Sequence, residues 1–167
     1  VEGVIGARDR PRPEAREVIE ELRRLGILRV ALLTGDSQAA ARPVAEALHI
    51  LECHAGLLPQ DKAELIAGWQ SGTPPLKVAM VGDGINDAPA LARASAGLAL
   101  GGTADVAAEA GDVVLMIGPA QGERSPLTHL PFLLRLSRET VRIIRQNIVW
   151  FAFAVNAVGI VLTAWLW

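Results

Sequence analysis

The sequence predicts an α/β domain built on a parallel β-sheet and followed by a transmembrane helix. Three observations lead to this fold class. Short apolar runs alternate with segments of helical periodicity through most of the 167 residues, a pattern typical of parallel strands joined by crossover helices. Polar turns follow two of the apolar runs, and the last twenty residues carry no charge. With 51% hydrophobic residues, the chain has ample material for a buried core.

The predicted helices and strands follow one another in a regular order. Residues 12–26 have apolar side chains at helical spacing and end in Gly26, which suits a helix C-cap. Residues 118–126, which contain Gly and Pro, are the predicted linker to the last helix. Between these segments we expect, in order, a strand in 27–36, a helix in 37–50, a strand in 53–58, a helix in 59–70, a strand in 77–81, a helix in 86–94, a strand in 96–100, a short helix in 104–111 and a strand in 112–116.

The end of the chain has the length and composition of a membrane span. Residues 148–167 form an uncharged stretch that would extend over about 30 Å as a helix, the thickness of bilayer hydrocarbon. Trp150 lies near one end, and Trp165 and Trp167 lie near the other, as in an interfacial aromatic belt. We therefore expect a transmembrane helix in 147–167 and a lipid bilayer as its surroundings. A buried helix of a soluble core is the alternative.

A basic helix precedes the predicted span. Four arginines recur at intervals of 3, 4 and 3 residues, which places them on one helix face: Arg135, Arg138, Arg142 and Arg145. Basic residues beside a membrane span favour the cytoplasmic side, so residues 1–145 are expected to be cytosolic. A solvated basic face without topological meaning is the alternative. The net charge of −2 indicates no nucleic-acid partner.

Two polar clusters mark the candidate site. Thr34, Gly35 and Asp36 follow the apolar run "VALL", and the sequence "GDGIND" (82–87) follows "VAMV". Ligands of open α/β sheets bind outside the carboxyl ends of the strands, so both clusters are expected at one edge. Carboxylates, backbone amides and a hydroxyl group can together hold a hard cation and a phosphoryl group.

Other interpretations explain the glycine-containing loop less well. A dinucleotide-binding loop would need a third glycine where Asp87 stands, and a phosphate-binding P-loop would need a closing Gly-Lys-Ser/Thr. An EF-hand beginning at Asp83 would place Ala94 where a bidentate Glu is required. A capped turn, with Asp87 or Asn86 as N-cap, accounts for one of the three polar residues but not for all of them.

The motifs "TGD", "PQDK" and "MVGDGINDAPAL", in this order, resemble those of the phosphorylation domain of P-type cation-transporting ATPases. These enzymes belong to the haloacid-dehalogenase-like superfamily. Further segments are similar at matching places, so the resemblance covers almost the whole chain and is strongest with the heavy-metal branch. It implies a haloacid-dehalogenase-like Rossmannoid sheet, Mg²⁺ and ATP as cofactors, and a transported metal cation as partner.

The resemblance also implies roles for individual residues. Asp83 would coordinate Mg²⁺, while Asn86 and Asp87 would hold its loop and the phosphoryl oxygens. Three further residues would contact the transferring phosphoryl group, namely Thr34 through its hydroxyl, Gly35 through its amide and Lys62 through its charge. Asp36 and Asp9 match acidic positions near the site and the hinge. Lys62 taken alone would be an ordinary solvated helix lysine.

One part of the family's machinery is missing from the sequence. The family forms an aspartyl phosphate on the motif Asp-Lys-Thr-Gly-Thr, which does not occur here. Asp61-Lys62-Ala63 imitates its first residues but stands at a predicted helix start, so Asp61 is rejected as nucleophile. The nucleotide domain and earlier membrane helices are absent too. We therefore expect a carboxyl-terminal piece of a transporter, whose missing N-terminal parts are its partners and without which it is inactive.

The predicted domains are a partial phosphorylation domain (1–125), a cytosolic basic linker helix (126–146) and a transmembrane helix (147–167). In this superfamily the nucleophile strand lies between the strand ending in "TGD" and the one ending in "GDG". The sheet should therefore be incomplete, with unpaired ladder groups and reduced stability of residues 1–125.

Asn156 lies in the middle of the predicted span, with Thr163 on roughly the same face. A polar residue at this depth either contacts the transported cation or binds a neighbouring helix by hydrogen bonds. Copper-type relatives have a Tyr-Asn pair in this region, where this chain has Val155-Asn156.

Three functional classes follow for the chain as a whole. The first is part of an ATP-driven heavy-metal transporter. The second is a non-catalytic, membrane-anchored module that binds Mg²⁺ or phosphate. The third, a soluble haloacid-dehalogenase-like phosphatase, needs an Asp-x-Asp motif that the sequence lacks and has no need of a membrane span.

Overall fold

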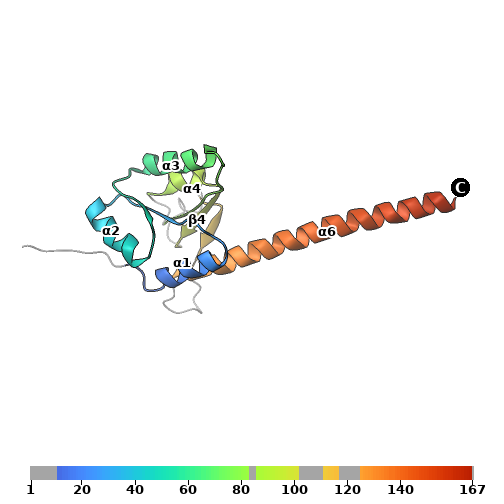
Figure 1. The fold of residues 1–167 in the computed structure, drawn as a ribbon, viewed down its shortest axis with the longest axis horizontal. Coiled ribbons are helices and arrows are strands. Elements are labelled where there is room, and N and C mark those ends of the chain that lie inside the picture. Colours follow the sequence, from blue (N-terminus) through green and yellow to red (C-terminus); the bar gives the residue numbers. More distant parts are fainter. Residues whose placement is uncertain (1–10, 83–85, 102–110, 117–124, 167) are drawn as a thin grey trace, which may run out of the picture. The chain divides into compact units, whose positions relative to one another are not determined.

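The computed structural model describes residues 11–82, 86–101, 111–116 and 125–166 (Figure 1). Most of the short helix predicted in 104–111 lies outside these ranges. The predicted order of the other helices and strands is confirmed. The elements are α1 (Ala15–Arg24), β1 (Ala31–Leu33), α2 (Gln38–Ala47), β2 (Glu52–His54), α3 (Pro59–Ser71), β3 (Ala79–Gly82), α4 (Ala88–Arg93), β4 (Ala96–Leu100), β5 (Val113–Leu115), the 3₁₀ helix η1 (Pro126–His129) and α6 (Leu130–Trp165).

The strands are parallel, as the alternating pattern predicts, but they form two separate sheets. One sheet contains β1 and β2, with Ala31 opposite Glu52. The other has the order β3-β4-β5, with Ala79 opposite Ala96 and Leu98 opposite Val113. Within the described part of the chain, β1 and β3 each have a strand partner on one side only. Strands β1 and β3 are therefore not paired with each other, and the expected incomplete sheet is confirmed.

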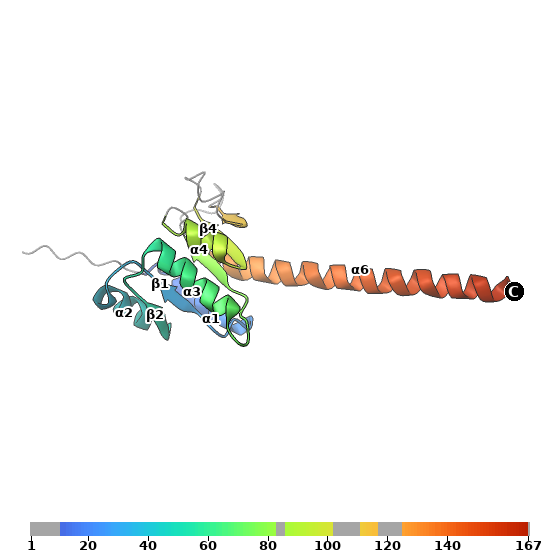
Figure 2. The same cartoon turned by 90° about the horizontal axis from the view of Figure 1, so that it is seen from above.

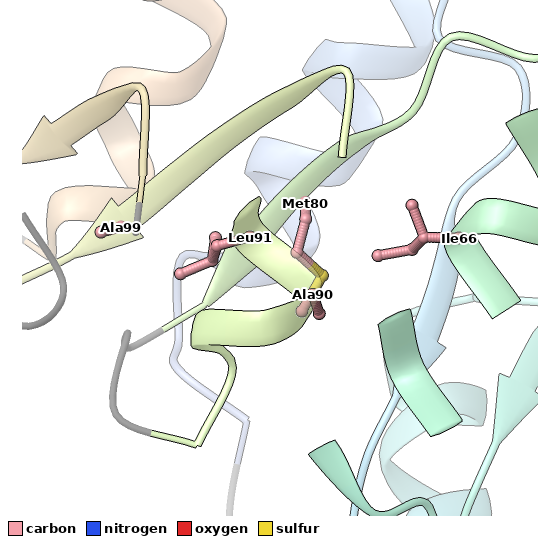
Figure 3. Close-up of a cluster of buried hydrophobic side chains, with 5 residues drawn as sticks. All are labelled: Ile66, Met80, Ala90, Leu91 and Ala99. Atoms are coloured by element: carbon pink, nitrogen blue, oxygen red, sulfur yellow. The ribbon is translucent and has the colours of Figure 1, made fainter. Parts of the chain in front are cut away.

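Leu32 and Leu33 of β1 point to opposite faces of the strand, and each packs against a different core cluster. Leu33 packs against a core cluster of Ile66, Met80, Ala90, Leu91 and Ala99, which joins α3 and α4 to β3 and β4 (Figure 3). Leu32 packs against a second cluster formed by Ala15, Ala45, Leu48 and Ile50, which joins α1 to α2 and its following turn. All three residues of β1 are only partly buried, although its two faces meet different core clusters.

Helices α3 and α4 lie side by side over the first of these clusters (Figures 1 and 2). Ile66 of α3 and Ala90 of α4 are completely buried in it. Because both helices begin after a strand, their first turns lie toward the carboxyl ends of the strands, where the site is predicted.

Residues 125–130 belong to the compact unit that spans Val1–Leu130. Ser125 is 5% exposed, and its hydroxyl accepts a hydrogen bond of 3.2 Å from Nη1 of Arg12. Leu127 in η1 packs against the second core cluster, beside α1. The end of the predicted linker is therefore packed against the start of α1. The boundaries proposed at residues 125 and 146 remain predictions.

The second unit, Pro131–Trp167, is made up of α6. Helix α6 runs without interruption from Leu130 to Trp165, so it covers most of the predicted basic linker helix (126–146) and most of the predicted span (147–167), while residues 126–129 form η1 instead. A window of this helix has a mean hydropathy of 2.0 and is not buried in the described structure. By length and composition, α6 can cross a membrane.

Charged and aromatic side chains surround the beginning of the β1-β2 sheet. Arg29 donates two hydrogen bonds of 2.7 Å to the two carboxylate oxygens of Glu52, and Nε2 of His54 lies 3.0 Å from one of them. The guanidinium carbon of Arg29 also lies 4.8 Å from the ring centre of Trp69, which is a cation–π contact. Hydrogen bonding from Arg29 lowers the pKa of Glu52 from 4.5 to about 2.

The lowered pKa of Glu52 predicts how stability depends on pH. The Glu52 carboxylate stabilises the folded chain fully above its unfolded pKa of 4.5, and this contribution is lost as the pH falls toward about 2. In Glu52→Gln, the free energy of unfolding should fall less steeply over that pH range, and at pH 7 it should be lower by up to about 1 kcal/mol. Urea unfolding at several pH values checks both effects. Glu46→Gln, which removes an exposed ion pair with Arg42, is the control. Its free energy of unfolding should change with pH as that of the wild type does.

Candidate active site

The two predicted polar clusters follow β1 and β3. Thr34, Gly35 and Asp36 come directly after Leu33, the last residue of β1. The second cluster follows β3, which ends at Gly82. Its Asp83, the predicted Mg²⁺ ligand, lies outside the described residues, as does Asp9.

The loop after β1 is held by two hydrogen bonds between its own residues and by three backbone hydrogen bonds to residues 54–57. The Thr34 hydroxyl donates to Oδ2 of Asp36 over 3.0 Å and accepts from the Asp36 amide over 3.1 Å. The carbonyl of Thr34 accepts a hydrogen bond from the amide of Leu57, which ties this loop to the one that precedes α3. Gly35 is exposed, and its amide makes no hydrogen bond with a described residue. The Gly35 amide is therefore accessible to a ligand.

Lys62 and Asp87 form an ion pair that is almost completely buried. Nζ of Lys62, in the first half of α3, lies 2.6 Å from Oδ1 of Asp87, and the two side chains are 10% and 14% exposed. Burying a charged group is unfavourable unless it is paired and hydrogen-bonded, and here each charge provides the other's partner. Lys62 is therefore not a solvated helix lysine, the alternative that the sequence allowed.

Asp87 occupies the N-cap position of α4, but its side chain makes no capping hydrogen bond. The interpretation of this loop as a simple capped turn is therefore wrong for Asp87, because its carboxylate binds Lys62 instead. Asn86 lies in the turn just before it and is exposed. The turn thus directs one polar side chain inward and leaves its neighbour at the surface.

Gly82 is a positioning residue that sequence reasoning did not single out. A Cβ atom at Gly82 would lie 2.5 Å from Oδ2 of Asp87 and 2.8 Å from its Cβ, distances that real Cβ atoms essentially never show. Only glycine at the end of β3 therefore lets the Asp87 side chain lie where it meets Lys62. The signal in the sequence was a glycine at the last position of an apolar strand, where a larger residue would be expected.

The structure thus brings Lys62 and Asp87 together from positions 25 residues apart. It leaves Asn156 in the other unit, on α6, where its Nδ2 donates 2.8 Å to the carbonyl of Ala152. Among the described residues, no three His, Cys, Asp or Glu side chains are grouped so that they could hold a metal ion. The predicted roles of the individual site residues remain predictions.

Comparisons with known proteins give the same family as the motifs. A profile of the haloacid dehalogenase-like hydrolase family matches residues 1–95. The chain is 46% identical to the zinc-transporting ATPase of Bacillus subtilis (strain 168), a match that covers 93% of this chain and 23% of the relative. It is 40% identical to the probable cadmium-transporting ATPase of Listeria monocytogenes, over 98% of this chain and 22% of the relative.

A solved structure agrees with these relatives. The crystal structure of a zinc-transporting PIB-type ATPase in the E2.Pi state matches with a TM-score of 0.71 and 39% identity, and covers 84% of this chain and 21% of that one. The chain thus spans about a fifth of the length of the relatives it matches. Helix α6 is long and apolar enough to cross a membrane, and the relatives named above are transporting ATPases. Both findings support the predicted membrane location. The chain belongs to the haloacid dehalogenase-like hydrolase family and is homologous over nearly its whole length to the heavy-metal P-type ATPases.

Proposed function

We propose that this chain is part of an ATP-driven heavy-metal transporter that works through an aspartyl phosphate. The chain supplies the groups that bind Mg²⁺ and stabilise the phosphoryl group, while the nucleophile and the nucleotide domain come from other parts of the transporter. The buried ion pair between Lys62 and Asp87 carries this proposal. The ammonium group of Lys62, held in place by Asp87 near the carboxyl ends of parallel strands, is suited to binding an anionic ligand.

Lys62 is the proposed contact for a phosphoryl oxygen. Its ammonium group has three N–H donors, of which Asp87 takes one, so the others can point at a ligand. Asp87 then orients the ammonium group of Lys62. Because the ion pair already exists, the charge needs no reorganisation when negative charge builds up on the transferring group, which is the condition for effective electrostatic stabilisation.

Thr34 and Gly35 are proposed to bind the same phosphoryl group from the β1 side. The Gly35 amide is accessible, whereas the Thr34 hydroxyl donates to Asp36 and has to rotate away before it can donate to a ligand. Asp36 and a phosphoryl group thus compete for the Thr34 hydroxyl. Asp83 is the proposed Mg²⁺ ligand, with Asn86 and Asp87 supporting its loop. The oxygen donors of these side chains fit Mg²⁺, which would neutralise charge on the phosphoryl group.

The transported cation is not specified by these residues. The relatives named above are described as zinc-transporting and cadmium-transporting, so a soft or borderline divalent cation is proposed. Nδ2 of Asn156 donates a hydrogen bond to the carbonyl of Ala152, and its Oδ1 can accept a cation or a hydrogen bond from a neighbouring helix. In this proposal residues 1–145 lie on the cytosolic side.

The proposal is tested first by reading the coding DNA upstream of Val1, and then by phosphorylating the longer protein with radiolabelled ATP. An in-frame Asp-Lys-Thr-Gly-Thr motif and a nucleotide domain are expected. Lys62→Met should reduce phosphoenzyme formation by about 100-fold, the loss typical of removing one such charge-stabilising group. Lys77→Met, which changes an exposed lysine before β3, should leave it unchanged.

A folding defect is distinguished from a catalytic one by Lys62→Arg. This variant keeps the charge and a partner for Asp87 but presents a planar fork in place of a compact ammonium group. We expect normal circular dichroism with strongly reduced phosphorylation. A start codon at Val1 with no upstream motif would instead favour the membrane-anchored module that binds Mg²⁺ or phosphate without catalysis.

A further inference from the structure

The part of α6 ahead of its apolar stretch has two chemically different faces. Successive residues of an α-helix are rotated by about 100°, so the four arginines of this part lie within an arc of about 80°. Together with Glu139, residues 135–145 contain four arginines and one acidic residue, a net charge of +3. Around the rest of the helix lie apolar side chains that are about half exposed, namely Leu136 (50%), Ile143 (47%) and Ile144 (50%).

The arginines lie at different distances from the apolar stretch that begins at Ile148. With a rise of about 1.5 Å per residue, Arg145 is about 4.5 Å from Ile148 along the helix axis and Arg142 about 9 Å. Arg138 and Arg135 are about 15 Å and 20 Å away. The headgroup layer on each side of a bilayer is about 5 to 7 Å thick, and charges act over about 8 Å in physiological salt.

We propose that Arg145 and Arg142 bind the phosphate groups of anionic lipids in the leaflet next to the cytosolic part of α6. The proposal rests on α6 crossing the membrane, as in the proposed function. A guanidinium group binds phosphate oxygens through two parallel hydrogen bonds, and clusters of basic residues beside a span attract anionic lipids. In an upright helix, Arg138 and Arg135 lie beyond the headgroups and do not take part.

Arg145 is the stronger of the two lipid ligands. Arg142 already donates a 2.7 Å hydrogen bond to Glu139, which neutralises part of its charge. Arg145 makes no ion pair with an acidic side chain in the part of the chain that the structure describes. Its guanidinium group is therefore fully available, and it is also the arginine nearest to the apolar stretch.

The proposal can be tested with the full chain in lipid vesicles, because Trp150 lies five residues beyond Arg145, about 7.5 Å along the helix. Trp69, Trp165 and Trp167 are replaced by Phe, so that fluorescence reports Trp150 alone. Brominated phosphatidylglycerol and brominated phosphatidylcholine quench tryptophan on contact, and comparing them gives the relative affinity for the anionic lipid. We expect a preference for phosphatidylglycerol that Arg145→Gln lowers about fivefold, the factor that corresponds to about 1 kcal/mol per arginine near an anionic surface.

Arg135→Gln is the matched control, since it removes the same charge from the same face about 15 Å farther from the membrane. It should leave the preference unchanged, as should inorganic phosphate added to the buffer. Equal quenching by both lipids, or an equal effect of Arg135→Gln and Arg145→Gln, would overturn the proposal. A lack of quenching by either lipid would overturn it together with the membrane placement of α6. Phosphoenzyme formation is measured separately, so failure of the catalytic proposal is distinguishable from all of these outcomes.

Discussion

Replacing Asp87 by Ala should lower the free energy of unfolding by about 3 kcal/mol, the low end of the effect of breaking a buried ion pair. The substitution leaves the ammonium group of Lys62 in a site where its side chain is only 10% exposed, without a negative partner. Urea unfolding of the full chain in detergent micelles, followed by circular dichroism, measures this loss. A decrease below about 1 kcal/mol would show that water or another group replaces Asp87, and that the pair is not a fixed part of the site.

Three further variants test whether the charge of Asp87 accounts for this loss. The double variant Lys62→Met, Asp87→Leu removes both charges, and it should recover most of the stability, because apolar pairs often replace buried ion pairs without loss. Arg42→Met removes an exposed ion pair with Glu46, whose side chains are 74% and 66% exposed, and should change stability by less than about 0.5 kcal/mol. Gly82→Ala should resemble Asp87→Ala, since its Cβ would displace the Asp87 carboxylate from Lys62.

Supplying the missing strand should stabilise the chain strongly. Strands β1 and β3 each lack a neighbour on one side in the described structure, whereas β4 is paired on both sides. Unpaired backbone groups are unfavourable when buried, and an open strand edge is prone to pair with other chains. Extending the chain upstream through the nucleophile segment should raise the melting temperature by at least about 10 °C, which corresponds to about 3 kcal/mol for a chain of this size.

Hydrogen exchange locates this effect within the sheets. In the 167-residue chain, the amides of β4 should exchange at least about tenfold more slowly than those of β1 and β3, because local opening depends on the contacts on both sides of a strand. In the extended protein the difference should largely disappear. A cooperative melt of the short chain above about 65 °C, the upper end of the range for ordinary domains, would contradict the prediction of reduced stability.

The sequence alone was sufficient for the order of the helices and strands that the structure describes, because apolar spacing and turn residues act locally. Gly26 is an example: it follows the last turn of α1 with a φ of 88°, a conformation that glycine adopts without strain. The strand lengths were less predictable. The apolar run in 27–36 suggested a long strand, but β1 extends only from Ala31 to Leu33, since hydrogen bonding to its neighbour β2 sets its length.

The predicted site residues were also read from the sequence, through motifs that follow two strands, but their pairing was decided by the tertiary structure. The resemblance gave Lys62 and Asp87 roles at the site, but the sequence alone also allowed a solvated helix lysine and a helix cap. Only the packing of α3 against α4 brings their charges within 2.6 Å and buries them. Likewise, Ser125 looked like part of a linker, although it contacts Arg12 across 113 positions of the chain. Local spacing determines which residues form a helix or a strand, whereas contacts between distant residues depend on how those elements pack.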